Sequence, residues 1–212
     1  FRPRLPVLGK VKIRLPEGQR IALHAGVNDE IATELYYKGY EGYEKATAEV
    51  FRRLAKRSKV ILDIGANTGY FALMAARINP EAHVYAFEPV ERVYKLLVNN
   101  RKRNGLRNLT AIMAAVADFD GEIDLYVPRG ETPSSASTRE GFRRRSVTRV
   151  PVPALKIDSY ARRKNLERID LAKIDTESTE PAALRGMSEI LGRDSPIVIC
   201  EVLNGRTEED LM

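Results

Sequence analysis

Short apolar runs separated by amphipathic segments dominate the chain from residue 60 onward. Five such runs occur, at Val60–Ile64, Val84–Phe87, Leu109–Met113, Leu171–Ile174 and Ile197–Cys200. Segments with helical periodicity fit between most of them, at Tyr70–Ile78, Glu91–Asn104 and Pro181–Leu191. Strands that are apolar without alternation, and are joined by helices, are typical of a parallel sheet covered on both faces. The pattern therefore predicts an α/β fold.

The first 58 residues follow a different pattern. Lys10–Leu15 alternates between polar and apolar positions, and Ile21–Leu23 can pair with it across a turn at Pro16–Gly18. Two helical segments follow. One contains Ile31, Leu35 and Tyr36, and the other runs from Tyr43 to Lys56 with Ala46, Val50, Phe51 and Leu54 on one face. We expect residues 1–58 to form a β-rich lead-in with helices, and residues 59–212 to form the main domain.

One stretch interrupts the alternation of strands and helices. Glu122–Val127 and Val147–Pro153 have the pattern of two antiparallel strands, which predicts an inserted β-hairpin. The segment Pro128–Ser146 between them is rich in Ser, Thr, Gly and Arg and is expected to be a mobile loop. Its run Arg143–Arg145 either contacts solvent or belongs to a lid that binds a carboxylate or phosphate of a ligand.

Composition narrows the class of protein. The chain has 212 residues, of which 43% are hydrophobic, enough for one globular domain. Since no apolar stretch approaches the ~18 residues of a membrane helix, we expect no membrane span. The single Cys200 suits a reducing compartment, and the chain begins at Phe1 without an apolar leader, so a cytoplasmic location is expected. Only His24 and His83 are present, which leaves little room for a His-rich metal centre.

The net charge of +6 permits a partner that carries phosphates. The 35 Lys and Arg side chains are scattered, however, and scattered basic residues commonly do no more than solvate a surface. Nucleic acid is therefore the less favoured partner.

Polar residues gather where the predicted strands end. Open α/β sheets bind their ligands outside the carboxyl ends of the strands. The candidates at those ends are Asp63, Gly65, Asn67 and Gly69 after the first strand, Glu88 after the second, Asp118 after the third, Asp175 and Glu177 after the fourth, and Glu201 after the fifth. His83 begins a strand and is expected to be structural.

The run from Asp63 to Gly69 is a glycine-containing turn between a strand and a helix. A turn that binds NAD has the pattern G-x-G-x-x-G, whereas here Asn67 and Tyr70 replace the second and third glycines. Glu88 lies 25 residues after Asp63, and a carboxylate at that place can accept both hydroxyls of a ribose. The pair indicates an adenosine-containing ligand other than NAD, with a plain tight turn as the alternative.

Taken together, these motifs resemble the FkbM family of S-adenosylmethionine-dependent methyltransferases. The matching segments are Val60–Gly69, Ala86–Pro89, Leu97 with Asn100, Ala114–Asp118 with Gly121, Ser134–Ser135, and Lys173–Glu177 with Glu180 and Gly186. The resemblance implies a class I methyltransferase fold, which is Rossmann-like, and S-adenosylmethionine as cofactor. It also implies methylation of a hydroxyl oxygen on a small molecule, natural product or glycan.

The resemblance further implies roles for individual residues. The turn would pass under the methionine part of the cofactor, Glu88 would bind its ribose, and Asp118 with its neighbours would border its adenine. The cofactor-binding set is then Asp63, Gly65, Ala66, Asn67, Gly69, Glu88, Pro89 and Asp118. Asp175 would face the transferred methyl group.

Two features depart from the family's pattern. Where the family has Asp-Val-Glu-Gly, this chain has Asp175-Thr176-Glu177-Ser178, which replaces a glycine beside the expected acceptor. The family also continues past its fifth strand with a helix and two strands, so we expect the domain to be incomplete at Met212.

Methyl transfer to an alcohol requires alignment and the removal of a weakly acidic proton. Asp175 is the best candidate for the base and Glu177 the next, although either carboxylate can instead be a structural partner of Lys173 or Arg185. We expect no metal, while Asp175, Glu201 and Asn204 could imitate a metal-dependent site. An RNA methyltransferase and a non-catalytic protein with the cofactor fold remain the alternative functions.

Overall fold

The computed structural model describes residue 5 and residues 7–26, 29–128 and 147–202. A five-stranded parallel sheet forms its centre, in the order β10-β9-β3-β4-β5. These strands are β3 (Val60–Ile64), β4 (His83–Phe87), β5 (Leu109–Ile112), β9 (Leu171–Ile174) and β10 (Ile197–Cys200). The five predicted strands are confirmed, each to within one residue. The strand order reverses between β3 and β9, which is where such sheets bind ligands.

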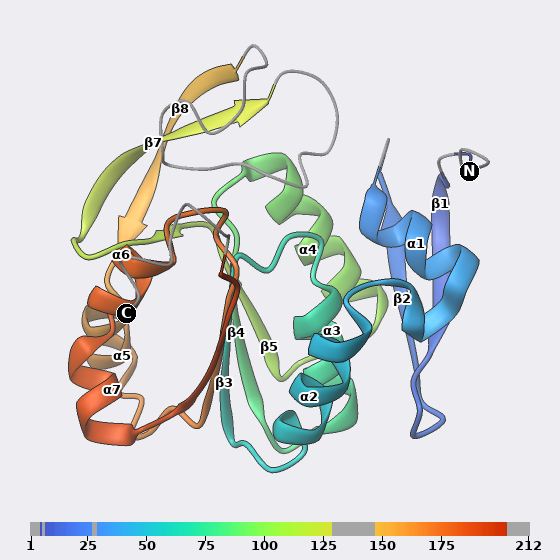
Figure 1. Cartoon of the computed structure of the whole chain (residues 1–212), viewed down its shortest axis with the longest axis horizontal. Helices are drawn as coiled ribbons and strands as arrows, with labels where there is room; N and C mark the ends of the chain where they lie inside the picture. Colours follow the sequence, from blue (N-terminus) through green and yellow to red (C-terminus); the bar gives the residue numbers. More distant parts are fainter. Residues whose placement is uncertain (1–4, 6, 27–28, 129–146, 203–212) are drawn as a thin grey trace.

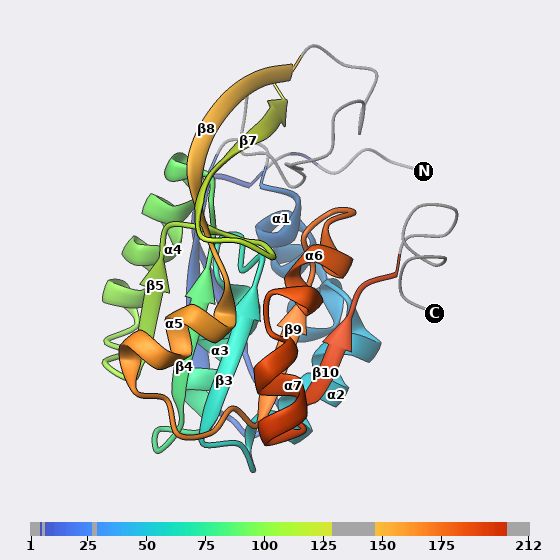
Figure 2. The ribbon, with the colours of Figure 1, turned by 90° about the vertical axis from the view of Figure 1, so that its left-hand side faces the viewer.

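Helices cover both faces of this sheet, as expected (Figures 1 and 2). One face carries α2 (Lys45–Ala55), α3 (Tyr70–Ile78) and α4 (Glu91–Arg103), and the other carries α5 (Ile157–Lys164), α6 (Glu180–Arg185) and α7 (Ser188–Asp194). Successive strand residues point to opposite faces. Ile61 accordingly joins the core beneath α2 and α3, whereas Leu62 joins the core beneath α5 and α7. Both faces are apolar because both are covered.

The lead-in packs outside α3 and α4 (Figure 1). Its strands β1 (Gly9–Arg14) and β2 (Arg20–Ala25) form the predicted antiparallel hairpin, followed by α1 (Glu30–Lys38) and the 3-10 turn η1 (Gly39–Gly42). Asn100 of α4 and Asn104, the C-terminal cap of α4, form hydrogen bonds with the backbone of β2. Asn100 Oδ1 accepts the His24 N–H at 2.8 Å, and Asn104 accepts the N–H of Ala22 at 2.9 Å and donates to its carbonyl at 2.7 Å. Apolar residues of the hairpin and of the main sheet share one hydrophobic core.

The predicted buried face of α2 is partly wrong. Ala46 and Val50 are exposed, and the helix instead buries Ala48, Phe51, Arg52 and Ala55. Arg52 can be buried because Glu17, at the tip of the β1–β2 hairpin, forms an ion pair with its guanidinium. The partner that permits this burial is thus 35 residues away in the sequence. In α1, Ile31 and Leu35 are buried, whereas Tyr36, which shares their helical spacing, is exposed.

The helix predicted over Pro181–Leu191 is in fact two helices, α6 and α7. A new helix begins there with its first turn capped by Asp158 of α5, whose carboxylate accepts the N–H groups of Glu189 at 3.2 Å and Ile190 at 3.1 Å. Neither α5 nor the short strand β6 (Ala115–Val116) was predicted from the sequence pattern. Both depend on packing partners elsewhere in the chain.

The inserted hairpin is confirmed as β7 (Gly121–Pro128) and β8 (Val147–Leu155), which pair antiparallel, while β6 pairs parallel with β8. The hairpin extends past the carboxyl ends of the main strands (Figure 2). Its base packs on α4 through a small apolar cluster that includes Leu125, Val152, Val90 and Val93. Residues 129–146, with the Arg143–Arg145 run, lie outside the described residues.

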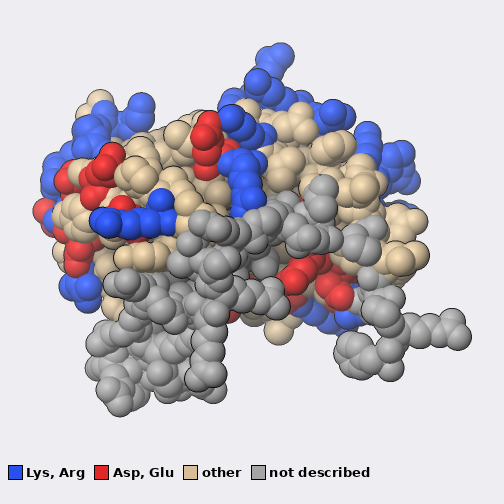
Figure 3. Space-filling view, turned by 90° about the horizontal axis from the view of Figure 1, so that it is seen from above, with Lys and Arg blue, Asp and Glu red and all other residues tan. Residues whose placement is uncertain are grey.

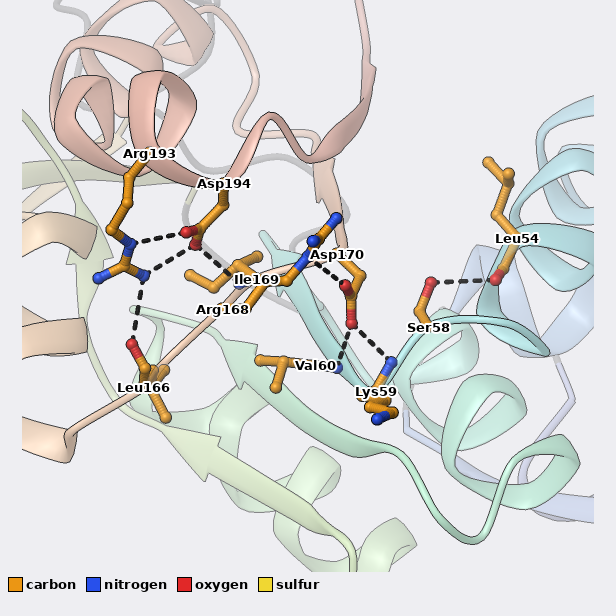
Figure 4. A network of polar contacts seen from close by, with 10 residues as sticks. All are labelled: Leu54, Ser58, Lys59, Val60, Leu166, Arg168, Ile169, Asp170, Arg193 and Asp194. Atoms are coloured by element: carbon orange, nitrogen blue, oxygen red, sulfur yellow. Dashed lines mark hydrogen bonds and ion pairs between the residues drawn. The ribbon is translucent and has the colours of Figure 1, made fainter.

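Charged groups at the amino ends of the strands have structural roles (Figure 4). Asp170 Oδ2 accepts the N–H groups of Lys59 at 2.7 Å and Val60 at 3.0 Å, and Asp194 accepts that of Ile169 at 2.8 Å. His83 Nε2 lies 2.9 Å from Thr110 Oγ1, at the end of the sheet where β4 begins. Across the described ranges, every helix is too short or too polar to cross a membrane.

Candidate functional site

A pocket of about 110 Å³ opens at the carboxyl ends of β3, β4 and β9. Figure 3 looks onto this end of the molecule and shows small acidic patches with basic side chains beside and between them. Lining residues come from the turns after all five main strands and from the lead-in. They are Ile31, Tyr43, Glu44, Ile64–Asn67, Tyr70, Phe71, Phe87–Val90, Ala114–Val116, Leu125, Lys173, Asp175–Glu177, Thr179 and Glu201.

The glycine turn is shaped by contacts on both sides. The N–H groups of Gly65 and Ala66 both donate to the Phe87 carbonyl, at 3.0 and 2.9 Å. Gly65 has φ +81°, and a β-carbon there would lie 1.8 Å from the Asp175 carbonyl oxygen. Gly69 has φ +99°, and its β-carbon would meet the Leu97 side chain at 2.5 Å. Both glycines are therefore required by backbone conformation and close packing.

Glu88 ends β4 directly beside this turn. Only 6% of its surface is exposed, and its carboxylate accepts the N–H groups of Asn67 at 3.0 Å and Val90 at 2.9 Å. Burial raises the pKa of Glu88 to about 7, even though these hydrogen bonds oppose the shift. An apolar wall adjoins it, built from Pro89, Val90, Ala114, Ala115, Val116 and Leu125. A carboxylate beside a flat apolar wall is suited to a ribose joined to an aromatic base.

Lys173 forms the charged floor of the pocket. It is 4% exposed, and its Nζ lies 2.8 Å from Asp175 Oδ2 and 4.5 Å from the centre of the Phe71 ring. Its neighbour across the β3–β9 pair is Asp63, which is fully buried. Burial raises the pKa of Asp63 to about 6, while the Lys173 ammonium lowers it. Burial also raises the pKa of Asp175, but Lys173 outweighs it, so the net shift is downward.

Several lining residues had been assigned no role in cofactor binding or catalysis, among them Tyr43, Glu44 and Glu201. Tyr43 and Glu44 come from the lead-in, between η1 and α2, and Glu201 follows β10. Burial, and then the Glu44 and Asp175 carboxylates, raise the pKa of the Tyr43 hydroxyl. The position of Glu201 directly after the fifth predicted strand already indicated that it could line the pocket. Nothing local distinguishes Tyr43 and Glu44 from ordinary residues at a helix start.

The turn after β9 is held by one buried carboxylate. Glu180 Oε1 accepts the Thr176 N–H at 2.8 Å, the Thr176 hydroxyl at 3.1 Å and the Ser178 N–H at 3.2 Å. Ser178 stands where the family pattern has glycine, and it adopts φ +88°. Among the described residues, six non-glycine positions have positive φ, and Glu44, Asn67, Glu177 and Ser178 lie at or beside the pocket. Such strain commonly concentrates at functional sites.

The structure brings most of the predicted site residues together. Gly65, Ala66, Asn67, Glu88, Pro89, Asp175 and Glu177 line the pocket. Of the other predicted residues that the structure describes, Asp63 lies beneath the floor and Gly69 packs on α4, while Asp118 forms an ion pair with Arg185 at 2.9 Å. The residues just before Asp118 line the pocket instead. Asn204, considered for a metal site, lies outside the described residues.

The chain is similar to known methyltransferases in sequence. Residues 63–210 match the family model described as the Methyltransferase FkbM domain. The 2-O-methyltransferase NoeI of Sinorhizobium fredii is 27% identical over 169 residues, covering 71% of this chain and 69% of that protein. The methyltransferase sdnD of Sordaria araneosa is 28% identical over 158 residues, covering 61% and 60%.

Solved structures share the fold at low sequence identity. The methyltransferase FkbM of Methylobacillus flagellatus has a TM-score of 0.52 and 14% identity, over 87% of this chain and 47% of that one. A SAM-dependent methyltransferase from Agrobacterium tumefaciens also has a TM-score of 0.52, with 12% identity, over 96% and 56%. This chain thus spans about half the length of these two structures. The fold is that of the class I methyltransferases, and the chain belongs to the FkbM methyltransferase domain family.

Proposed function

We propose that this protein transfers a methyl group from S-adenosylmethionine to a hydroxyl oxygen of a small-molecule or glycan acceptor. The observation that carries the proposal is the buried Glu88 carboxylate, which lies between the glycine turn and an apolar wall. This combination matches an adenosine, because a carboxylate can accept hydrogen bonds from the ribose hydroxyls and apolar side chains can pack on the base. The 2-O-methyltransferase among the relatives favours an oxygen acceptor.

The residues of the pocket have separable tasks in this proposal. Glu88 and the turn at Gly65–Asn67 bind and orient the cofactor, which when bound supplies a methyl group activated by its sulfonium. Alignment of acceptor and methyl group can contribute ~7–11 kcal/mol to lowering the barrier. The carboxylates that line the pocket after β9, Asp175 and Glu177, are placed to assist removal of the acceptor's proton, and a positioned base is worth ~10²–10⁴-fold in rate.

Calorimetric titration with S-adenosylhomocysteine tests the cofactor, with NAD as the competing ligand. S-adenosylhomocysteine should bind more tightly, and Glu88→Ala should weaken it by ~1.5–3 kcal/mol for each hydrogen bond lost. Glu88→Gln is the matched control, because it keeps the shape and one acceptor oxygen and should lose less affinity. Tighter binding of NAD, or unchanged affinity in a folded Glu88→Ala variant, would overturn the cofactor assignment.

Methyl transfer itself is tested with S-adenosylmethionine carrying a labelled methyl group. A panel of neutral sugars, glycosides and polyols should include acceptors that gain an alkali-stable methyl ether. Label transferred only to RNA would instead support the alternative function.

A further inference from the structure

Three ionisable groups form a chain from the floor of the pocket to its mouth. Lys173 is buried at the floor and holds one oxygen of Asp175 at 2.8 Å. Asp175 in turn lies beside Glu201, the residue after β10, and the two carboxyl groups line the same pocket and are placed to share a hydrogen bond. The backbone fixes this arrangement, because the Asp175 N–H donates to the Ile64 carbonyl at 3.0 Å and the Glu201 N–H to the Ile174 carbonyl at 2.9 Å. Asp175 and Glu201 therefore leave neighbouring parallel strands side by side.

A hydrogen bond between two carboxyl groups requires a proton on one of them. The ammonium of Lys173 stabilises the ionised form of Asp175, so the proton belongs on Glu201, which donates to Asp175. Partial burial and the negative charge of Asp175 raise the pKa of Glu201 to about 8. The charged or ionisable groups around Glu201 are Asp175 and Lys173 of the β9 end, Glu177 and Glu180 of the following turn, Tyr43 and Glu44 of the lead-in, and the adjoining Cys200. The carboxylates among these groups disfavour a second negative charge on Glu201, whereas the Lys173 ammonium favours it.

We propose that Asp175 and Glu201 act as a carboxyl pair that shares one proton, in which Glu201 exchanges the proton with the acceptor and Asp175 positions it. This rests on the proposed function. Glu201 must first lose its proton to solvent. The acceptor's O–H bond then breaks with its proton passing to the Glu201 carboxylate, an oxygen electron pair forms the new O–CH3 bond, and the electrons of the S–CH3 bond remain on sulfur as S-adenosylhomocysteine is left.

The shared proton can be measured without any acceptor. S-adenosylmethionine carries a positive sulfonium where S-adenosylhomocysteine has a neutral sulfur, so the ratio of their affinities reports the charge of nearby carboxyls. Calorimetry with both ligands from pH 6 to 9.5 should show the affinity for S-adenosylmethionine increasing about ten-fold relative to that for S-adenosylhomocysteine. The increase should be centred near pH 8, where Glu201 ionises. Glu201→Gln should abolish the step. Asp175→Asn removes the neighbouring charge and should move the step to lower pH.

A flat ratio in the wild type, or a step that survives in Glu201→Gln, overturns the pair. Failure of either ligand to bind at any pH would instead refute the proposed function. On the fastest acceptor of the panel above, kcat should rise with pH to a plateau above about 8, and Glu201→Gln should lose ~10²-fold at the plateau. Asp175→Asn should move that rise to lower pH and should lower the plateau less than Glu201→Gln does. The reverse pattern, with Asp175→Asn inactive and Glu201→Gln active, would make Asp175 the base.

Discussion

Gly65 and Asp175 are in backbone contact where the neighbouring strands β3 and β9 end, and a β-carbon on Gly65 would lie 1.8 Å from the Asp175 carbonyl oxygen. The contact joins the turn that is expected to bind the cofactor to Asp175, whose carboxylate is expected to lie beside the acceptor. Any change that separates the two strand ends therefore alters both parts of the pocket together.

Gly65→Ala should be strongly destabilising. The alanine must tolerate φ +81°, which costs ~1–2 kcal/mol, and must also displace backbone, which adds ~1–3 kcal/mol. The matched control is Gly105→Ala. Gly105 has φ +64°, and a β-carbon added there would meet no atom within 4 Å, so only the conformational cost remains. Urea unfolding measures both variants. Equal losses of stability would show that the close contact with Asp175 is absent.

Ser178→Gly should stabilise the protein by ~1–2 kcal/mol. Glycine adopts the φ of +88° without strain, and among the described residues the buried Ser178 Oγ has no hydrogen-bond partner. Ser195→Gly is the control, because Ser195 also has positive φ but is exposed, so its gain should be below ~1 kcal/mol. A loss of stability in Ser178→Gly would mean that the hydroxyl makes a favourable contact.

Asn104→Ala should loosen the lead-in. It removes both hydrogen bonds to Ala22 and should cost ~2 kcal/mol, with faster amide hydrogen exchange along β2. Asn99→Ala, which removes only a contact with Arg103 on the exposed side of α4, should cost less than ~0.5 kcal/mol. Unchanged exchange of the Ala22 amide in Asn104→Ala would argue against this docking.

The buried Asp63 should make stability fall as pH rises. Burial raises its pKa to about 6, so the folded state keeps the proton to higher pH than the unfolded chain, whose carboxyl ionises near 3.8. The unfolded state therefore binds fewer protons between about pH 4 and 6, and stability declines by at most ~1.4 kcal/mol per pH unit from this group. Asp63→Asn should remove that decline, measured by urea unfolding at pH 4, 5, 6 and 7. A constant difference between wild type and variant across this range would contradict the assignment.

Glu88→Gln should behave similarly over a higher range. Its carboxyl is buried and has a pKa of about 7 against 4.5 when unperturbed, so its contribution declines between those values. Between about pH 6 and 7, urea unfolding should show the stability of Asp63→Asn still falling, because Glu88 is still ionising there, while Glu88→Gln shows no such fall.

The spacing of apolar residues was sufficient to predict the strands and most helices. A strand that is buried on both faces has an uninterrupted run of apolar residues, which is easily recognised. The spacing of apolar residues could not show where α7 begins. The first turn of α7 contains Glu189 and is capped by Asp158, which lies 31 residues earlier in the chain. That spacing also could not show that Arg52 would be buried, because the charge that permits this is on Glu17.

The sequence by itself determined the α/β class, the glycine turn and the carboxylates at the strand ends, because each depends on residues close together in the chain. Only the tertiary structure decided which of those groups meet. Asp63 and Lys173 are 110 residues apart and become neighbours through the register of β3 and β9, and the lead-in brings Tyr43 and Glu44 into the same pocket. The physical reason is that burial patterns specify the face of each element, whereas the pKa of a carboxyl depends on charges a few ångströms away that only strand register and packing bring together.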